Sequence, residues 1–186
     1  SGFVPGAGGG ALVLEELDTA LARGARIYAE ILGGDVNSGG QRMGGSMTAP
    51  NSAAVQACIK NAIKEAGITP ESIDLISGHL TSTMADPIEL NNWVEALNIP
   101  IADLPLINAT KSMIGHCIAG AGAIELVGCA LQMHGKFVHG NLNIEELHPE
   151  ILKIIPAEKI PTVTVESNLN IVAKANFGFG DVNSCI

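Results

Sequence analysis

The sequence has little charge, few aromatic side chains and no long apolar run, and each shortage narrows the class of protein. Only 16% of its 186 residues are charged and 3% are aromatic, whereas 47% are hydrophobic. No apolar run approaches the roughly 18 residues that a membrane-spanning helix needs. The net charge of −9 leaves no basic stripe that could neutralise nucleic-acid phosphates. We therefore expect a globular chain with no membrane span and no nucleic-acid partner.

The cysteines lack the spacing of a disulfide framework or of a zinc module. The sequence contains four of them, none in a CxxC pair: Cys58, Cys117, Cys129 and Cys185. A reduced, cytoplasmic setting is therefore expected, and the first residues lack the basic-then-apolar pattern of a signal peptide. A metal site of His79, His116 and Cys117 would not match the ligand spacing of zinc modules. We expect no metal.

Short apolar runs alternate with helical patterns along the chain. We expect strands at 11–15, 27–35, 73–76, 104–107, 162–166 and 171–177, the last two as an antiparallel pair. We expect helices at 17–23, 52–66, 86–97 and 119–134, and the alanine- and glycine-rich last helix should pack inside the structure. Such alternation implies a mixed or parallel sheet covered on both faces. The prediction is one layered α/β/α domain over residues 1–186, with a mixed, mostly five-stranded sheet.

Two histidines follow short apolar runs and have small or hydroxyl-bearing neighbours. His79 stands after Gly78, and His116 stands after Gly115. Because ligands of α/β sheets bind at the carboxyl ends of strands, we expect both imidazoles in one crevice. Two neutral imidazoles there, with Lys111 nearby, would be well placed to hold a developing oxyanion.

Two charged residues and two threonines surround these histidine segments. Lys111 and Glu125 lie in apolar, glycine-rich stretches where an unpaired charge is costly to bury, so we expect them to pair. Such a pair could be purely structural, but its position beside a histidine loop favours a functional role. Thr81 and Thr83 either line a narrow entrance or cap the following helix, and the residues alone leave both readings open.

Four motifs in the same order carry a resemblance to a known family. Residues 2–15 are similar to the pattern DGFVxGEGAGxLVLE, and residues 79–89 to HGTxT…DxxE. Residues 111–125 are similar to KSMxGHxxGAAGxxE, and residues 176–183 to NsFGFGGxN. Along nearly its whole length, the chain resembles the C-terminal half of an elongating β-ketoacyl-acyl carrier protein synthase, which implies a thiolase-like fold.

The resemblance implies a decarboxylative Claisen condensation in fatty acid, polyketide or polyene synthesis. An acyl group is held on a cysteine as a thioester, malonyl-acyl carrier protein loses CO2, and the resulting carbanion attacks the acyl carbonyl. His79 and His116 would be catalytic, because they would hydrogen-bond the malonyl thioester oxygen and stabilise the enolate. Lys111 and Glu125 would organise the site.

The same resemblance implies how substrates are held. Thr81 and Thr83 would hold the pantetheine arm, and the motif assigns substrate binding to Phe177, Gly178 and Phe179 as well. Phe179 would act as a gate, with its backbone N–H in the oxyanion hole of the acyl group. No cofactor is implied beyond the phosphopantetheine arm of the acyl carrier protein, which carries the substrate. The implied partners are that carrier protein and, for the full-length protein, a second copy.

The chain departs from the family patterns at several positions. Leu80 stands where the family has a glycine, Asp181 replaces the second glycine of FGFGG, and Ala7 replaces a glutamate. The segment between Thr83 and Asp86 is one residue shorter than usual. We expect Leu80 to reshape the space beside the first histidine, and Asp181 to put a carboxylate beside the oxyanion-hole loop. The departures favour a divergent synthase for a polyene, a pigment or another secondary metabolite over housekeeping elongation.

The family nucleophile lies in a segment like TACSS in the N-terminal half, and no such segment occurs in this sequence. Cys58 and Cys129 have the pattern of helix-core residues, and Cys117 and Cys185 match no nucleophile context. Covalent catalysis of this class cannot start without an activated nucleophile. We therefore expect the C-terminal half of a longer enzyme, inactive alone, whose absent N-terminal half supplies the cysteine.

Two other functions stay open at this point. One is a non-catalytic partner subunit resembling a chain-length factor, and the other is a stand-alone binding module for acyl-pantetheine groups. The presence of both histidines and Lys111 favours the enzyme. The substitutions at Leu80 and Asp181 favour the partner subunit.

Overall fold

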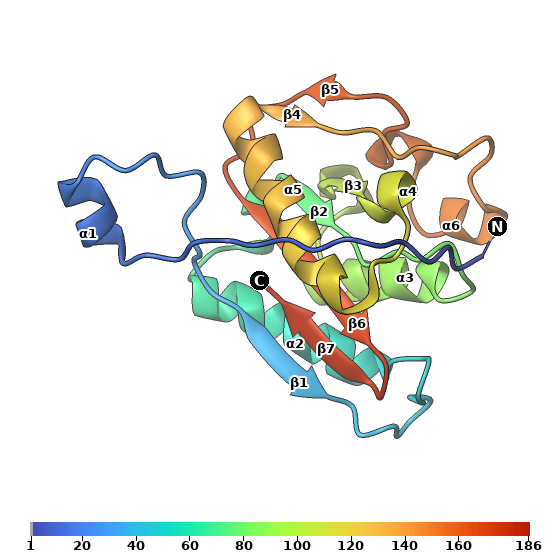
Figure 1. The fold of residues 1–186 in the computed structure, drawn as a ribbon. Helices are drawn as coiled ribbons and strands as arrows, with labels where there is room; N and C mark the ends of the chain where they lie inside the picture. Colours follow the sequence, from blue (N-terminus) through green and yellow to red (C-terminus); the bar gives the residue numbers. More distant parts are fainter. Residues whose placement is uncertain (1) are drawn as a thin grey trace.

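The computed structural model describes residues 2–186, and a mixed five-stranded sheet forms their centre (Figure 1). Its strands in spatial order are β1 (Asp35–Ser38), β7 (Val182–Cys185), β6 (Val172–Gly178), β2 (Leu75–Ser77) and β3 (Leu106–Asn108). Strand β2 is parallel to both β3 and β6, whereas β7 is antiparallel to both β6 and β1. The prediction of a mixed sheet with five strands is confirmed.

Helices cover both faces of this sheet. Helices α2 (Ser52–Ala66) and α3 (Asp86–Leu97) pack on one face, and α5 (Ala121–Gly135) crosses the other (Figure 1). Side chains of β6 alternate accordingly: Ala173 and Ala175 join the apolar core with α2 and α3, whereas Lys174 and Asn176 contact α5. The layered α/β/α prediction is therefore confirmed.

The predicted boundaries of α2 and α3 are confirmed, because residues that favour the start or the end of a helix stand at both ends of each. Asn51 accepts the backbone N–H groups of Ala53 and Ala54 at the start of α2, and Gly67 ends that helix with a φ of 65°. Helix α3 begins with a proline in its first turn and ends at Asn98, which is also left-handed. The remaining helices are short: α1 (Leu17–Ala22), α4 (Lys111–Ile114), α6 (Pro149–Leu152) and four single 3₁₀ turns.

Two of the predicted strands near the N-terminus do not form. Residues 11–15 are extended without a partner, and the strand predicted at 27–35 is present only from Asp35 onward. Among the described residues, none forms a strand pair with residues 11–15 or 27–34, and Val13 is 94% exposed. An apolar run becomes a strand only where a neighbour accepts and donates its backbone hydrogen bonds.

Two further predictions about the C-terminal part were wrong in detail. Strand β5 (Val165–Glu166) pairs with β4 (Phe137–Val138) in a separate small sheet, so it is not the partner of β6. That partner is β7, whose half-polar sequence gives no apolar run. Helix α5 buries only one face, and its Leu131 is 50% exposed, so it does not lie fully inside.

The main apolar core lies between the sheet and the helices α2 and α3, with Trp93 of α3 almost fully buried. On the α5 face, the strands β2 and β3 end in the buried polar residues Ser77 and Asn108. The histidine loops begin directly after these strand ends. None of the helices in the described part of the chain has the length and apolar character to cross a membrane.

Candidate active site

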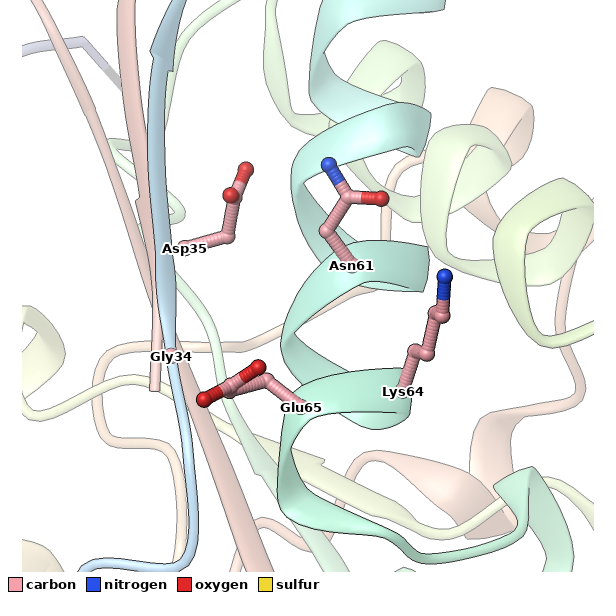
Figure 2. A pocket seen from close by; sticks show the side chains of 5 residues that line it. All are labelled: Gly34, Asp35, Asn61, Lys64 and Glu65. Atoms are coloured by element: carbon pink, nitrogen blue, oxygen red, sulfur yellow. The ribbon is translucent and has the colours of Figure 1, made fainter.

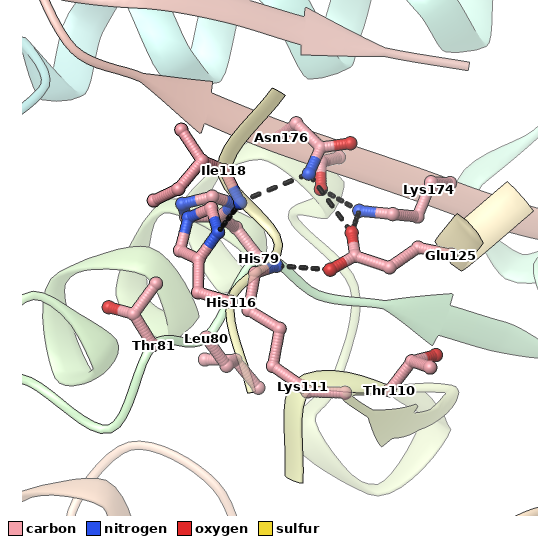
Figure 3. Close-up of polar contacts among 12 residues, drawn as sticks. His79, Leu80, Thr81, Thr110, Lys111, His116, Ile118, Glu125, Lys174 and Asn176 are labelled. Atoms are coloured by element: carbon pink, nitrogen blue, oxygen red, sulfur yellow. Dashed lines mark hydrogen bonds and ion pairs between the residues drawn. The ribbon is translucent and has the colours of Figure 1, made fainter. Parts of the chain in front are cut away.

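The two histidines lie side by side at the carboxyl ends of the parallel strands β2 and β3, as predicted. Their ring centroids are 5.0 Å apart and the rings are nearly perpendicular, at 82° (Figure 3). His79 follows β2 by two residues, and His116 follows the short helix α4. The fold thus brings together two side chains that are 37 positions apart in the sequence.

A buried group of charges lies behind the imidazoles. Glu125 of α5 forms ion pairs with both Lys111 and Lys174, the latter at 2.7 Å between Nζ and Oε2. All three side chains are at most 8% exposed. Burial raises the pKa of Glu125, but Lys174 and Lys111 outweigh burial and hold that pKa below its usual range. Burial lowers the pKa of Lys111, and Lys174 adds to this.

The predicted pair of Lys111 and Glu125 is therefore present, but it is part of a triad with one excess positive charge. Lys174 was not predicted from the sequence. The available signal was a lysine in the middle of the predicted strand 171–177, where an unpaired ammonium group would be costly to bury. A net positive cluster behind two imidazoles favours the binding of negative charge in front of them.

Asn176 connects this triad to His79 and fixes the proton on its ring. Its amide nitrogen lies 3.0 Å from Oε2 of Glu125 and 3.3 Å from Nδ1 of His79 (Figure 3). The ionised carboxylate only accepts hydrogen bonds, so the amide nitrogen must face it. The same nitrogen then donates to Nδ1 of His79, which leaves the ring proton on Nε2. Asn176 lies within the last family motif, but no role for it was predicted from the sequence.

His116 has its proton placed in the same way by the main chain. Its Nδ1 accepts the backbone N–H of Ile118 at 3.0 Å, so Nε2 carries the proton. Burial lowers the pKa of His79 to about 2, and Lys111 and Lys174 add to the effect. Burial and then Lys111 lower the pKa of His116 as well. At neutral pH the site therefore holds two uncharged imidazoles, each with an Nε2–H to donate.

The backbone of the first loop is held by two carboxylates of α3. Glu89 accepts the N–H groups of His79 at 2.7 Å and of Leu80 at 2.8 Å. Asp86 accepts the N–H groups of Thr81 and Ser82, both at 2.9 Å. Burial raises the pKa of Glu89 to about 7. Both carboxylates belong to the family pattern HGTxT…DxxE, and the structure shows that they bind the backbone of the first histidine loop.

The predicted substrate-binding residues lie around the same loop. The hydroxyl groups of Thr81 and Thr83 form a hydrogen bond of 2.9 Å with each other, and Thr83 also accepts the N–H of Ala85 at the start of α3. The second contact matches the capping interpretation of Thr83. Both threonines are half-buried beside the loop that carries His79.

The aromatic residues of the last motif differ in their distance from the histidines. The ring centroid of Phe177 lies 6.0 Å from that of His79, in an edge-on arrangement. Gly178 ends β6, and Phe179 is 65% exposed in the turn that follows. The structure thus places Phe177 against the imidazole and Phe179 at the surface.

The residues that depart from the family patterns do not disturb the imidazole pair. Leu80 packs against the apolar core, and its N–H is bound by Glu89. The carboxylate of Asp181 accepts N–H groups of Asn51 and Gln41, which belong to the loop between β1 and α2. The carboxylate therefore lies in the turn beside Phe179, as expected, and it is bound to the loop between β1 and α2.

Two hollows on the surface of the described residues lie away from the histidines. One of about 240 Å³ lies between β1 and α2 and is lined by Gly34, Asp35, Asn61, Lys64 and Glu65 (Figure 2). Another of about 690 Å³ lies beside β4 and β5. Neither contains a histidine, so we assign the site from its hydrogen bonds and charges instead of from a cavity.

Comparison with known proteins agrees with the fold and with the motifs. The model of the family "Beta-ketoacyl synthase, C-terminal domain" matches residues 28–145. The chain is 38% identical over 187 residues to 3-oxoacyl-[acyl-carrier-protein] synthase 2 of Rhizobium meliloti, an alignment that covers all of this chain and 42% of the relative. It is 34% identical to the chloroplastic 3-oxoacyl-[acyl-carrier-protein] synthase I of Arabidopsis thaliana and covers 38% of it. The chain thus spans about two fifths of the length of these curated relatives, 38% and 42%.

Solved structures give the same result. The ishigamide ketosynthase/chain length factor matches with a TM-score of 0.87 and 34% identity, over 98% of this chain and 43% of that one. A type II polyketide synthase ketosynthase in complex with its acyl-carrier protein matches with a TM-score of 0.80 and 30% identity, over 92% and 40% of the two chains. The chain therefore belongs to the β-ketoacyl synthase C-terminal domain family and has the thiolase-like fold of its ketosynthases.

Proposed function

We propose that this chain supplies the malonyl-activating half of a condensing enzyme, a 3-oxoacyl-[acyl-carrier-protein] synthase of fatty acid or polyketide synthesis. One observation carries the proposal: two uncharged imidazoles lie side by side, and each has its Nδ1 occupied by a donor. Their Nε2–H groups are the donors that an oxyanion requires. The buried triad of Lys111, Glu125 and Lys174 adds positive charge behind them.

In this reaction the bond between the malonyl α-carbon and the carboxylate breaks, and CO2 leaves. The electron pair moves into the thioester and places negative charge on its carbonyl oxygen, which His79 and His116 stabilise by hydrogen bonds. The enolate carbon then attacks the acyl thioester, and the cysteine thiolate leaves. Uncharged imidazoles suit this task because they donate hydrogen bonds, whereas an imidazolium would readily protonate the carbanion.

The nucleophile of the reaction should come from an N-terminal half. All four cysteines of this chain are buried, and burial raises the pKa of Cys58 and of Cys185 to about 12. Burial raises the pKa of Cys129 as well. Thiols of this kind are poor nucleophiles. The curated relatives are more than twice as long as the matched region, since it covers 38% and 42% of them, which leaves room for such a half.

The proposal includes the partners that this reaction needs. An acyl carrier protein would deliver the malonyl group on its phosphopantetheine arm, and Thr81 and Thr83 beside His79 would hold that arm. A solved relative is a ketosynthase in complex with its acyl-carrier protein, which supports this partner. Phe177, Gly178 and Phe179 would border the acyl group. The full-length protein would work as a homodimer in the cytoplasm.

The structure removes the main support for a non-catalytic partner subunit. That alternative rested on Leu80 and Asp181. Leu80 packs into the core and Asp181 binds the loop between β1 and α2, so neither side chain blocks the imidazoles. Both imidazoles and their supporting hydrogen bonds are in place, which favours the enzyme.

The test separates the two half-reactions in the full-length protein that carries this chain. His79→Ala and His116→Ala should each lower malonyl decarboxylation and condensation by about 10²–10³-fold, while acylation of the cysteine persists at least in part. Turnover of malonyl-acyl carrier protein and intact-mass detection of the acyl-enzyme measure these steps. His134→Ala at the exposed end of α5 is the matched control. Normal malonyl turnover in either site variant would rule out the assigned roles.

A further inference from the structure

Asp181 is a buried carboxylate that the proposed reaction does not use. It stands in the turn between β6 and β7, is 1% exposed and has a φ of 65°. Aspartate tolerates this left-handed conformation better than most residues, although glycine tolerates it best. A carboxylate buried to this degree needs hydrogen-bond donors. Both donors are backbone N–H groups: Asn51 donates to Oδ1 at 2.7 Å, and Gln41 donates to Oδ2 at 2.9 Å.

These donors belong to the loop at residues 39–51 between β1 and α2, which we call the 39–51 loop. It lies beside the β6–β7 turn (Figure 1). Two backbone hydrogen bonds of 2.9 Å also join the loop and the turn, from Gly39 N–H to the Asp181 carbonyl and from Gly180 N–H to the Met47 carbonyl. The loop and the turn are thus bound at several points along the loop.

The glycines of the loop fit the carboxylate closely. A Cβ added at Gly39 would lie 2.1 Å from Oδ2 of Asp181, and one added at Gly45 would lie 2.4 Å from it. These distances are far below van der Waals contact. The loop can therefore close around the carboxylate only because both positions lack a side chain.

The turn that the carboxylate holds is continuous with the histidine site. Asn176, which donates to His79, and Phe177, whose ring lies edge-on to His79, are the residues of β6 that lead into it. Phe179 stands within the turn. Anything that fixes the turn against the 39–51 loop therefore also fixes one wall of the space beside His79.

We propose that Asp181 is a positioning residue: its carboxylate clamps the 39–51 loop to the β6–β7 turn and so holds Phe177, which forms one wall of the space beside His79. The clamp stands on the geometry of this chain alone. Its effect on turnover rests on the proposed function. A fraction of molecules with an open clamp would bind substrate poorly, which raises KM and leaves kcat nearly unchanged.

The clamp can be tested by proteolysis of the full-length protein. Arg42 is the only lysine or arginine between Arg26 and Lys60, so tryptic cleavage after Arg42 reports on opening of the loop. Asp181→Gly suits the backbone and removes the carboxylate. It should accelerate this cleavage by at least about tenfold, because two charge-assisted hydrogen bonds are lost. Cleavage after Arg23, which is exposed and remote from the clamp, should not change.

A second substitution keeps the test decisive if Asp181→Gly folds poorly. Gly39→Ala pushes a methyl group into the carboxylate, so it should accelerate cleavage by about tenfold when residue 181 is aspartate. When residue 181 is glycine, the same change should have less than about a twofold effect, because the clash is gone. Equal effects of Gly39→Ala in both backgrounds, or unchanged cleavage in Asp181→Gly, would overturn the clamp.

Steady-state kinetics then separate the clamp from the proposed function. With malonyl-acyl carrier protein as substrate, Asp181→Gly should raise KM about threefold or more and change kcat by less than about twofold. A fall in kcat with KM unchanged would contradict a positioning role. If the proteolysis result holds but His79→Ala and His116→Ala turn over malonyl normally, the proposed function fails and the clamp stands.

Discussion

The loops that carry His79 and His116 meet at one site but are fixed by different parts of the chain. Two carboxylates of the adjacent helix α3 accept the backbone N–H groups of residues 79–82. The second loop instead pairs with a distant segment: His116 N–H donates to the Val4 carbonyl at 2.7 Å, and Gly6 N–H donates to the His116 carbonyl at 2.9 Å. One loop depends on its neighbours in sequence, and the other depends on residues more than 100 positions away.

This difference affects how firmly each imidazole is held. The first loop is tied to a helix whose residues Leu90 and Trp93 are almost fully buried. The second is tied to an extended N-terminal segment that is exposed over much of its length and has no strand partner in residues 7–34. Segments with few buried contacts open more easily than those tied to the core. We therefore expect the two loops to respond separately to pH and to substitution.

The largest difference that we expect is in the titration of the two rings. Burial, with Lys111 and Lys174, lowers the pKa of His79 to about 2. The pKa of His116 is lowered by burial and Lys111, but Glu125 opposes the shift. Both folded pKa values lie below 6.5, the ordinary value of a histidine side chain. The stability contributed by each neutral ring is therefore full above pH 6.5 and is lost as pH falls, when the unfolded chain takes up the proton first.

Proton NMR of the ring signals measures this difference. As pH falls below about 6.5, the His116 ring should take up its proton before the His79 ring, which should keep its neutral chemical shift down to about pH 4. Signals are assigned with the two alanine variants. If the His79 ring takes up its proton before the His116 ring, the first loop does not shield its imidazole from water better than the second loop does.

The contrast between local and distant support also explains which parts of the fold could be predicted from the sequence. The predictions were correct where a few neighbouring residues determine the structure. Asn51 and Gly67 cap the two ends of α2, and the apolar runs that end at Ile76 and Ile107 correspond to β2 and β3. The predictions were wrong where a strand needs a partner strand to form. Residues 11–15 have a strand-like composition, but no strand in the described part of the chain pairs with them. A backbone partner is a property of the fold, so composition cannot reveal it.

The same holds for the site. Both histidines, Lys111 and Glu125 were found from position and from the cost of burying charge. Lys174 and Asn176 were missed because the strand that carries them had no predicted place beside β2. The proton positions on the rings could not be predicted either, since they depend on contacts from Asn176 and Ile118.

We expect a smaller effect, on the free energy of unfolding, when Glu89 is replaced by an uncharged residue. Glu89 is one of the two carboxylates that hold the first loop. Burial raises the pKa of Glu89 from 4.5 to about 7, so the folded protein binds this proton more tightly than the unfolded chain. Its contribution to stability is full below pH 4.5 and is lost as pH rises to about 7. Glu89→Gln removes the titration. The free energy of unfolding of the wild type relative to Glu89→Gln should fall by on the order of 2–3 kcal/mol over this range.

Urea denaturation at several pH values measures this change, with Glu95→Gln on the exposed face of α3 as the matched control. Hydrogen exchange gives the second readout. In Glu89→Gln the amides of residues 79 and 80 should exchange faster, and the amide of His116 should not. A pH-independent difference between the wild type and Glu89→Gln would show that Glu89 stays ionised in the folded protein.

The smallest effect should come from breaking the support of the second loop. Gly6→Ala would place a Cβ 2.2 Å from the Ile114 carbonyl oxygen, which forces the N-terminal segment away from His116. Loss of the two backbone hydrogen bonds should cost about 1–2 kcal/mol. Gly9→Ala is the matched control, because a Cβ at Gly9 has no neighbour within 4 Å. Hydrogen exchange should increase at the amide of His116 and stay unchanged at the amide of His79, since the carboxylates of α3 still hold the first loop. Equal increases at both amides would mean that the loops form one cooperative unit and that the N-terminal segment supports the whole site.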